Sequence, residues 1–392
     1  MKKKCLHLAT LALLACSACE WTPTHAAEAR ESEPSLAVPA EPDALALDMF
    51  RHLAEQRRGN LVFSPASAEA ALRMLQEGAR GTTARELAAL PYGAAGITSA
   101  MQVESANALF ADTALPLRVP ESSVQRVPFS SALPQAIDTI NTWCSRHTHG
   151  KIDRLLSPTS LAPSTALVAC NAVYLNERWL HPFDSRPTVQ RPFHPTEGAP
   201  VQVEMMSHQD HYRYAEGDDW QAVALFYRRE GRTGEPGCFI GILPKGDARA
   251  FAAKLTAARL NAIRAALAAS QPKQVRVELP RMEIKTDTFS LKRTLTALGI
   301  EQAFSAGADF SGFSPQPLQL SDVVQQCYVR IDESGTEAAA ATAAIMVYCI
   351  LSPQLTVITF DRPFLWIIGD LTTSAPPYFM GICENPATPT HP

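Results

Sequence analysis

Apolar residues recur at helical spacing in several parts of the chain. In the segment 44–58, Met49 and Leu53 share one face of a helix with about 3.6 residues per turn. Thr83 and Glu86 have the spacing of a capping box, in which each side chain accepts a backbone amide of the other, so we expect a helix to open at Thr83. Helices are also expected from Ser67 through Gly78 and over 290–298, where Gly299 would close the helix.

Other stretches are continuously apolar and have the length of strands. The segment 165–176, with the sequence T-A-L-V-A-C-N-A-V-Y-L-N, predicts a long buried strand. Segments 239–244 and 275–280 predict further strands. Helical and extended segments are therefore both expected, and we find no internal repeat along the chain.

One stretch, 329–353, combines a strand-like opening with a run of small side chains. After Gly335 the order from Ala338 to Ala344 is Ala-Ala-Ala-Ala-Thr-Ala-Ala. Alanine favours helices, but no proline before Pro353 would stop this run from pairing in a sheet. One face of such a strand would carry Thr336, Ala338, Ala340, Thr342, Ala344, Met346 and Tyr348. That face has no charge and could be buried; composition alone leaves an alanine-rich helix or linker as the alternative.

The residues around this run resemble the reactive-centre loop of the serpins. The hinge of that loop is matched by Glu333-Ser334-Gly335-Thr336-Glu337-Ala338-Ala339-Ala340-Ala341-Thr342. The family's closing motifs are matched by Asp361-Arg362-Pro363-Phe364 and Phe379-Met380-Gly381. The resemblance extends back to about residue 43 through the N-x-x-x-S-P-x-S block that starts at Asn60. It implies an α+β fold in a single domain, 43–392, with three β-sheets, about eight or nine helices and an exposed loop.

The resemblance also assigns positions in the main sheet. It places Ser64 and Ser67 under the centre of the sheet, and Asn171 beside them in the region called the shutter. It places Trp179 near the top of the sheet, called the breach, where insertion of the loop begins. Ordinary core packing is the alternative for Asn171 and Trp179. Ser64 lacks a glycine elbow and precedes a proline, so we do not interpret it as a nucleophile.

Gln325 is the main departure from the family. Serpins usually have a histidine at this position, which bonds the shutter asparagine. A glutamine amide can both donate and accept hydrogen bonds, so a bond from Gln325 to Asn171 remains available. A glutamine does not titrate, so control by pH would be lost at this position.

The family's usual loop length places the scissile bond between Cys349 and Ile350, with Tyr348 and Met346 as alternates. No Lys, Arg, Asp or Glu lies between Ala338 and Asp361, which argues against proteases that require a basic or an acidic residue. Chymotrypsin-, elastase- or subtilisin-like serine proteases fit this loop, and papain-like cysteine proteases remain open. Oxidation of an exposed cysteine at the scissile bond would silence such an inhibitor.

Residues 1–19 have the pattern of an export signal, with three lysines before an apolar core that is too short to span a bilayer. Leu13-Leu14-Ala15-Cys16 resembles a bacterial lipobox, which implies cleavage before Cys16 and lipidation of its thiol. Cys19 is a second candidate, and an ordinary secretory signal is the alternative. Residues 20–42 are rich in Ala, Glu, Pro, Ser and Thr and predict a flexible tether. We therefore expect a membrane-anchored lipoprotein at the cell envelope or surface, or otherwise a secreted protein.

Composition excludes several classes of protein. With 46% hydrophobic and 19% charged residues the chain can fold, and its net charge of −4 does not favour nucleic acid as a partner. It has no P-loop and no dinucleotide fingerprint. The histidine pairs 147/149 and 208/211 lack a third ligand at metal-binding spacing. The cysteines beyond the tether are Cys144, Cys170, Cys238, Cys327, Cys349 and Cys383, and their spacing matches no metal motif.

The sequence therefore predicts a monomeric suicide inhibitor of serine endopeptidases that needs no cofactor and is not itself an enzyme. Its partners would be a target protease, bound covalently through the loop, and a membrane, bound through the lipid anchor. A non-inhibitory carrier or chaperone with the serpin fold is the alternative. Small residues at 338–341 favour the inhibitor, because non-inhibitory members tend to carry charged or bulky residues there. A lipoprotein hydrolase is disfavoured by the lack of a nucleophile–base motif.

Overall fold

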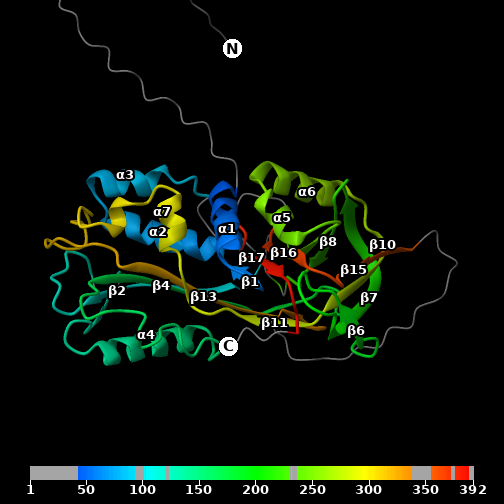
Figure 1. Cartoon of the computed structure of the whole chain (residues 1–392), viewed down its shortest axis with the longest axis horizontal. Coiled ribbons are helices and arrows are strands. Elements are labelled where there is room, and N and C mark those ends of the chain that lie inside the picture. Colours follow the sequence, from blue (N-terminus) through cyan, green and yellow to red (C-terminus); the bar gives the residue numbers. More distant parts are fainter. Residues whose placement is uncertain are drawn as a thin grey trace, which may run out of the picture. The chain divides into compact units, whose positions relative to one another are not determined.

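A computed structural model describes residues 43–93, 101, 103–120, 123–229, 231, 236–336, 355–371 and 376–387. All of them belong to one compact unit, Ala40–Pro392 (Figure 1). The predicted export signal, the tether and Cys16 lie outside the described residues. So do the loop residues Glu337, Ala338, Ala339, Ala340, Ala341, Thr342, Met346, Tyr348, Cys349 and Ile350.

The described residues contain seven α-helices and one 3-10 helix. The helices are α1 (Ala44–Gln56), α2 (Pro65–Gly78), α3 (Gly81–Ala89), α4 (Leu133–His147), α5 (Ala248–Ala253), α6 (Ala257–Ala269), α7 (Lys292–Ala297) and η1 (Gln302–Phe304). The predicted helices over 44–58 and up to Gly78 are confirmed. The helix expected over 290–298 is shorter, because Ser290 ends strand β12, and Gly299 follows the helix with φ +93°. None of these helices has the length and apolarity that a membrane span requires.

The predicted capping box at Thr83 is wrong. Helix α3 begins at Gly81, two residues earlier, so Thr83 lies within its first turn. The Thr83 hydroxyl instead accepts the backbone N–H of Asp309 at 2.9 Å. Glu86 accepts the N–H groups of Glu301 and Gln302 at 2.9 and 2.8 Å, at the start of η1. Both side chains therefore satisfy backbone donors of another segment.

Two hydrogen-bonded sheets make up the extended part of the fold. We call the sheet with eight described strands the large sheet, because the second one, with nine described strands, consists of two smaller sheets joined through one long strand. The large sheet contains β2 (Val103–Asp112), β3 (Gln125–Val127), β4 (Leu167–Leu175), β5 (Glu177–Arg178), β11 (Met282–Lys285), β12 (Phe289–Ser290), β13 (Asp322–Ile331) and β14 (Gly335–Thr336). The second contains β1 (Leu61–Phe63), β6 (Val189–Phe193), β7 (Val201–Glu216), β8 (Trp220–Phe226), β9 (Cys238–Pro244), β10 (Lys273–Pro280), β15 (Thr356–Thr359), β16 (Phe364–Gly369) and β17 (Phe379–Cys383).

The long strand β7 joins two smaller sheets into the second one. Its first part pairs with β6 and β10, and its last four residues pair with β8. If β7 is divided at this point, the three sheets expected from the sequence are all present. The predicted α+β fold is confirmed.

At the middle of the large sheet β4 pairs directly with β13 in parallel. The pairs run from Val168 with Asp322 to Tyr174 with Tyr328. All nine residues of β4 are buried, as its continuous apolar sequence predicts. Residues at even positions, such as Cys170, pack with the helix α4. On the other face Leu167 and Ala169 pack with the core that includes α1 and α2, and Val173 and Leu175 pack with a second core cluster. Figure 1 shows α4 on one face of this sheet and α2 over the other.

Candidate functional site

The described chain before the alanine run ends in a tight hairpin at the top of the large sheet. Strand β13 ends at Ile331, and β14 returns antiparallel, with Thr336 paired to Ile331. Asp332 stabilises the turn, because its N–H donates to the carbonyl of Gly335 at 3.0 Å and its carboxylate accepts the N–H of Ser334 at 2.9 Å. The first residues of the predicted hinge are therefore held in a defined conformation.

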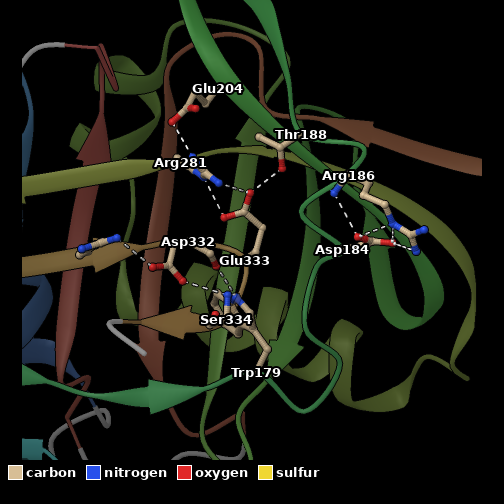
Figure 2. Close-up of polar contacts among 10 residues, drawn as sticks. Trp179, Asp184, Arg186, Thr188, Glu204, Arg281, Asp332, Glu333 and Ser334 are labelled. Carbon is tan, nitrogen blue, oxygen red and sulfur yellow. Dashed lines mark hydrogen bonds and ion pairs between the residues drawn. The ribbon is translucent and has the colours of Figure 1, made fainter. Parts of the chain in front are cut away.

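Glu333 is held in this turn by Arg281, which lies between β10 and β11. Arg281 donates to both carboxylate oxygens of Glu333, at 2.8 and 2.6 Å, and Thr188 donates to one of them at 2.5 Å (Figure 2). Arg281 also binds Glu204 at 2.7 Å. Burial by itself would raise the pKa of Glu333, but the bonds from Arg281 and Thr188 outweigh it and lower that pKa. The forked geometry makes this a directional attachment.

Trp179 and Phe183 hold the backbone of the same turn. The Trp179 amide donates to the carbonyl of Ser334 at 3.0 Å, and its indole Nε1 donates to the carbonyl of Asp332 at 2.8 Å. The Phe183 amide donates to the carbonyl of Glu333 at 2.9 Å. Figure 2 shows Trp179 beneath Ser334 and Asp332, with Arg281 reaching Glu333 from the opposite side. Trp179, the predicted breach residue, therefore contacts the hinge directly.

Gly335 and Thr336 lie between β13 and β5. The residues around them are Glu177, Arg178, Trp179, Tyr227 and Ile331. Gly335 pairs with Arg178 and Thr336 with Glu177. A Cβ atom on Gly335 would lie 2.1 Å from the carbonyl oxygen of Glu177, so only glycine fits so close to β5. Thr336 is 0% exposed, and its hydroxyl lies 2.7 Å from the hydroxyl of Tyr227.

A polar cluster, buried except for the half-buried Ser105 and Asn107, lies lower in the same sheet, on the face that α2 covers. We call it the shutter cluster: Ser64, Ser67, Ser105, Asn107, Asn171 and Gln325. Gln325 donates to Asn171 Oδ1 at 2.8 Å and to the carbonyl of Ser64 at 3.1 Å, and its Oε1 accepts the Ser64 amide at 2.9 Å. The bond between Gln325 and Asn171, which the sequence left available, is present.

Asn171 connects the two halves of the shutter cluster. Its amide donates to Ser67 Oγ and to Asn107 Oδ1, and Ser105 Oγ lies 2.6 Å from Ser67 Oγ. Because Asn171 is on β4 and Gln325 on β13, their bond crosses the seam between these two strands. A strand entering the seam must therefore separate them.

Sequence reasoning missed several residues that contact the predicted ones, including Ser105, Asn107, Thr188, Arg281 and Tyr227. Ser105 and Asn107 carried a signal, because they are polar residues two positions apart in strand β2 and so share one face. Arg281 and Tyr227 carried none, since their partners lie 52 and 109 residues away.

Other candidate groups do not assemble into a site. No cluster of three or more His, Cys, Asp or Glu side chains able to hold a metal is found among the described residues. His208 Nδ1 lies 2.5 Å from the Tyr212 hydroxyl, and His147 Nδ1 lies 2.8 Å from the carbonyl of Trp143. The described cysteines Cys144, Cys170, Cys238, Cys327 and Cys383 are free and buried. Burial raises the pKa of each thiol, so none of the five is poised as a thiolate.

Known proteins match this chain in both sequence and fold. The family model for serpin (serine protease inhibitor) matches residues 40–110 and 98–386. Iripin-2 from Ixodes ricinus is 32% identical over 361 residues, covering 83% of this chain and 88% of that protein. The structure of native protease nexin-1 with heparin has a TM-score of 0.76 at 27% identity, covering 89% of this chain and 99% of that one. The structure of human thyroxine-binding globulin is similar in fold, with a TM-score of 0.77 at 23% identity. The match covers 89% of this chain and 98% of that one.

Proposed function

Because the chain belongs to the serpin family, we propose that it is an irreversible inhibitor of serine endopeptidases that traps its target by inserting its own loop into the large sheet. The observation that carries the proposal is the position of β14. Its two residues already lie between β13 and β5, antiparallel to both. This is the orientation that an inserted strand needs between two parallel neighbours.

The register of β14 agrees with that of the seam below it. Thr336 pairs with both Ile331 and Glu177, and Gln325 pairs with Asn171 in the same parallel frame. If the chain continued downwards from Thr336 in this register, Ala338 would lie between Leu175 and Val329, and Ala340 between Val173 and Cys327. Thr342 would lie between Asn171 and Gln325. The alanines would face a buried layer in which charged side chains would be costly.

Insertion is favourable because one ladder of backbone hydrogen bonds is replaced by two. Opening the sheet breaks the ladder between β4 and β13, and the new strand then forms one ladder with each of them. Each backbone hydrogen bond is worth roughly 1 kcal/mol net. A strand from Glu333 to Cys349 would span on the order of 55 Å at about 3.3 Å per residue. A protease attached to its end would be carried the length of the sheet.

The covalent step uses the protease's own chemistry. Its serine attacks the carbonyl carbon of the scissile residue, the amide bond breaks, and the freed amine leaves, so an ester joins the protease to the new C-terminal end. We place this bond between Cys349 and Ile350, with Tyr348 and Met346 as alternates. The lack of charged residues between Ala338 and Asp361 supports chymotrypsin-, elastase- or subtilisin-like targets, and papain-like cysteine proteases stay open.

A gel tests the proposal. The protein is mixed with chymotrypsin or pancreatic elastase and the products are separated in SDS. The proposal expects a band at the summed mass of protease and inhibitor, which disappears when the protease serine is blocked beforehand. Cleavage of the loop with no such band, for every serine protease tried, would leave the non-inhibitory carrier or chaperone as the function.

The same proposal places the protein outside the cytoplasm, where such proteases act. Support comes from the residues 1–19, whose basic start, short apolar core and Leu-Leu-Ala-Cys ending favour an exported lipoprotein. Two acyl chains on Cys16 would give stable anchoring, since each buried methylene adds roughly 0.8 kcal/mol. Incorporation of labelled palmitate that is lost in Cys16→Ser and kept in Cys19→Ser tests this assignment.

A further inference from the structure

Tyr227 places a hydroxyl at the point where the hinge enters the sheet. It lies directly after β8 and is 1% exposed. Its hydroxyl lies 2.7 Å from the hydroxyl of Thr336, and this is its one hydrogen bond among the described residues. Thr336 is the last described residue before the alanine run, and it is fully buried. A residue of the body of the protein therefore binds the first side chain that would enter the seam.

Tyr227 is also held by contacts that do not involve Thr336. Its amide donates to the carbonyl of Gly237 at 2.9 Å. Its neighbours bind the segment that contains Trp179, since the Arg228 amide donates to the carbonyl of Arg178 at 2.8 Å. Its ring stacks on Trp179, with centroids 4.7 Å apart and planes inclined by 9°. The ring therefore cannot follow Thr336 if the hinge withdraws.

Withdrawal of the hinge would leave the Tyr227 hydroxyl buried without a partner. Burial raises the pKa of Tyr227, and the hydrogen bond with Thr336 partly offsets that effect. An unpaired polar group in a dry site is unfavourable, whereas the withdrawn Thr336 hydroxyl would find water. The bond thus biases the hinge toward the docked position.

We propose that Tyr227 is a positioning residue for loop insertion, whose hydroxyl holds Thr336 at the top of the seam so that insertion starts from a hinge already in register. This rests on the proposed inhibitory function. After the loop is cut, insertion competes with hydrolysis of the ester. A docked Thr336 leaves only the seam between β4 and β13 to open, while an undocked hinge must first find its register. One neutral hydrogen bond corresponds to a factor of about five in the docking equilibrium.

The test compares three variants with the wild-type protein. Tyr227→Phe keeps the stacked ring and removes the hydroxyl, Thr336→Val keeps the shape of the threonine, and a double variant combines both. Tyr214→Phe is the matched control, because that buried hydroxyl bonds Glu216 and Gln221 instead of the hinge. The first readout needs no protease: hydrogen exchange of the backbone amides over 332–336. The second is the ratio of cleaved inhibitor to covalent complex with chymotrypsin.

We expect amide exchange over 332–336 to rise about fivefold in Tyr227→Phe and in Thr336→Val, and not in the control. The ratio of cleaved to complexed inhibitor should rise by a similar factor. The double variant should match either single one, because both remove the same bond.

Three results would overturn the inference: unchanged exchange in Tyr227→Phe, additive effects in the double variant, or raised exchange with an unchanged ratio. A wild-type protein that forms no covalent complex at all would instead contradict the proposed function. The exchange measurement would still report on docking in that case.

Discussion

Gln325 donates a 2.8 Å hydrogen bond to Asn171 across the seam between β13 and β4. Both side chains are 0% exposed. The same glutamine amide also holds the backbone of Ser64 at the start of α2 through a donor and an acceptor bond. The seam is therefore closed by two uncharged, buried side chains, and one of them also binds the backbone at the start of α2.

The Gln325→Leu variant tests what this pair contributes. The substitution leaves the Asn171 carbonyl and the Ser64 amide without their present partners, so we expect a loss of about 2 kcal/mol in the free energy of unfolding. Urea unfolding of both proteins measures it. Gln135→Leu, at an exposed position on α4, is the control and should change little. Equal stability of Gln325→Leu and the wild type would mean that the bond does not hold the seam.

The Thr336→Arg variant tests burial of the hinge. Thr336 is fully buried between β13 and β5 with its hydroxyl on Tyr227, and an arginine cannot be buried there without a partner for its charge. We expect the variant to be cleaved by chymotrypsin as an ordinary substrate, with little or no covalent complex. Thr196→Arg, at an exposed position, should still form the complex. A stable complex from Thr336→Arg would contradict the entry point that we assign.

Glu333 should make the hinge sensitive to acid. Its bonds from Arg281 and Thr188 lower its pKa below the usual 4.5. A carboxylate with a lowered pKa in the folded state contributes stability that is fully present above 4.5 and is lost as the pH falls through the folded value. The difference in melting temperature between the wild type and Glu333→Gln should therefore shrink as the pH falls from 7 to below 4. A difference that is constant over this range would show that the ion pair contributes nothing measurable.

Glu69 on α2 should have the opposite effect to Glu333, because it should make the folded protein more stable as the pH falls. Burial raises its pKa to about 7, an effect that the Gly93 amide and Arg73 oppose and that Asp43 adds to. The folded state then binds the proton more tightly than the unfolded chain does, so stability rises as the pH falls from 8 through 7 toward 4.5. Relative to Glu69→Gln, the wild type should gain up to about 3 kcal/mol over this range. Thermal unfolding at a series of pH values measures it, and a flat difference would contradict the burial of an ionisable Glu69.

Helices and strands that depend on neighbouring residues along the chain were predicted well. Strand β4 was found because its apolar run is long enough to be buried on both faces. The helix α1 was found because its apolar positions share one face. The capping box at Thr83 failed, because the same local spacing also suits side chains that cap distant backbone, as Thr83 does for Asp309 and Glu86 for η1.

The site was predicted only in part because its contacts are non-local. Gln325 and Asn171 could be paired through the family resemblance, which supplied the partner. Arg281 and Tyr227 could not, since nothing in the neighbouring residues indicates that one binds Glu333 and the other Thr336. Such pairs follow from the arrangement of strands in the sheet, which sequence spacing alone does not determine.

The central claim is that the loop would be more stable inside the large sheet than outside it. Its most direct test is the melting temperature before and after the loop is cut near Cys349, with a matched cut in Thr336→Arg as the control. Insertion adds on the order of a dozen backbone hydrogen bonds, so the cut wild-type protein should melt at least about 10 °C higher, and the cut variant should not. A cut wild-type protein that melts at the same temperature as the intact one would contradict the account.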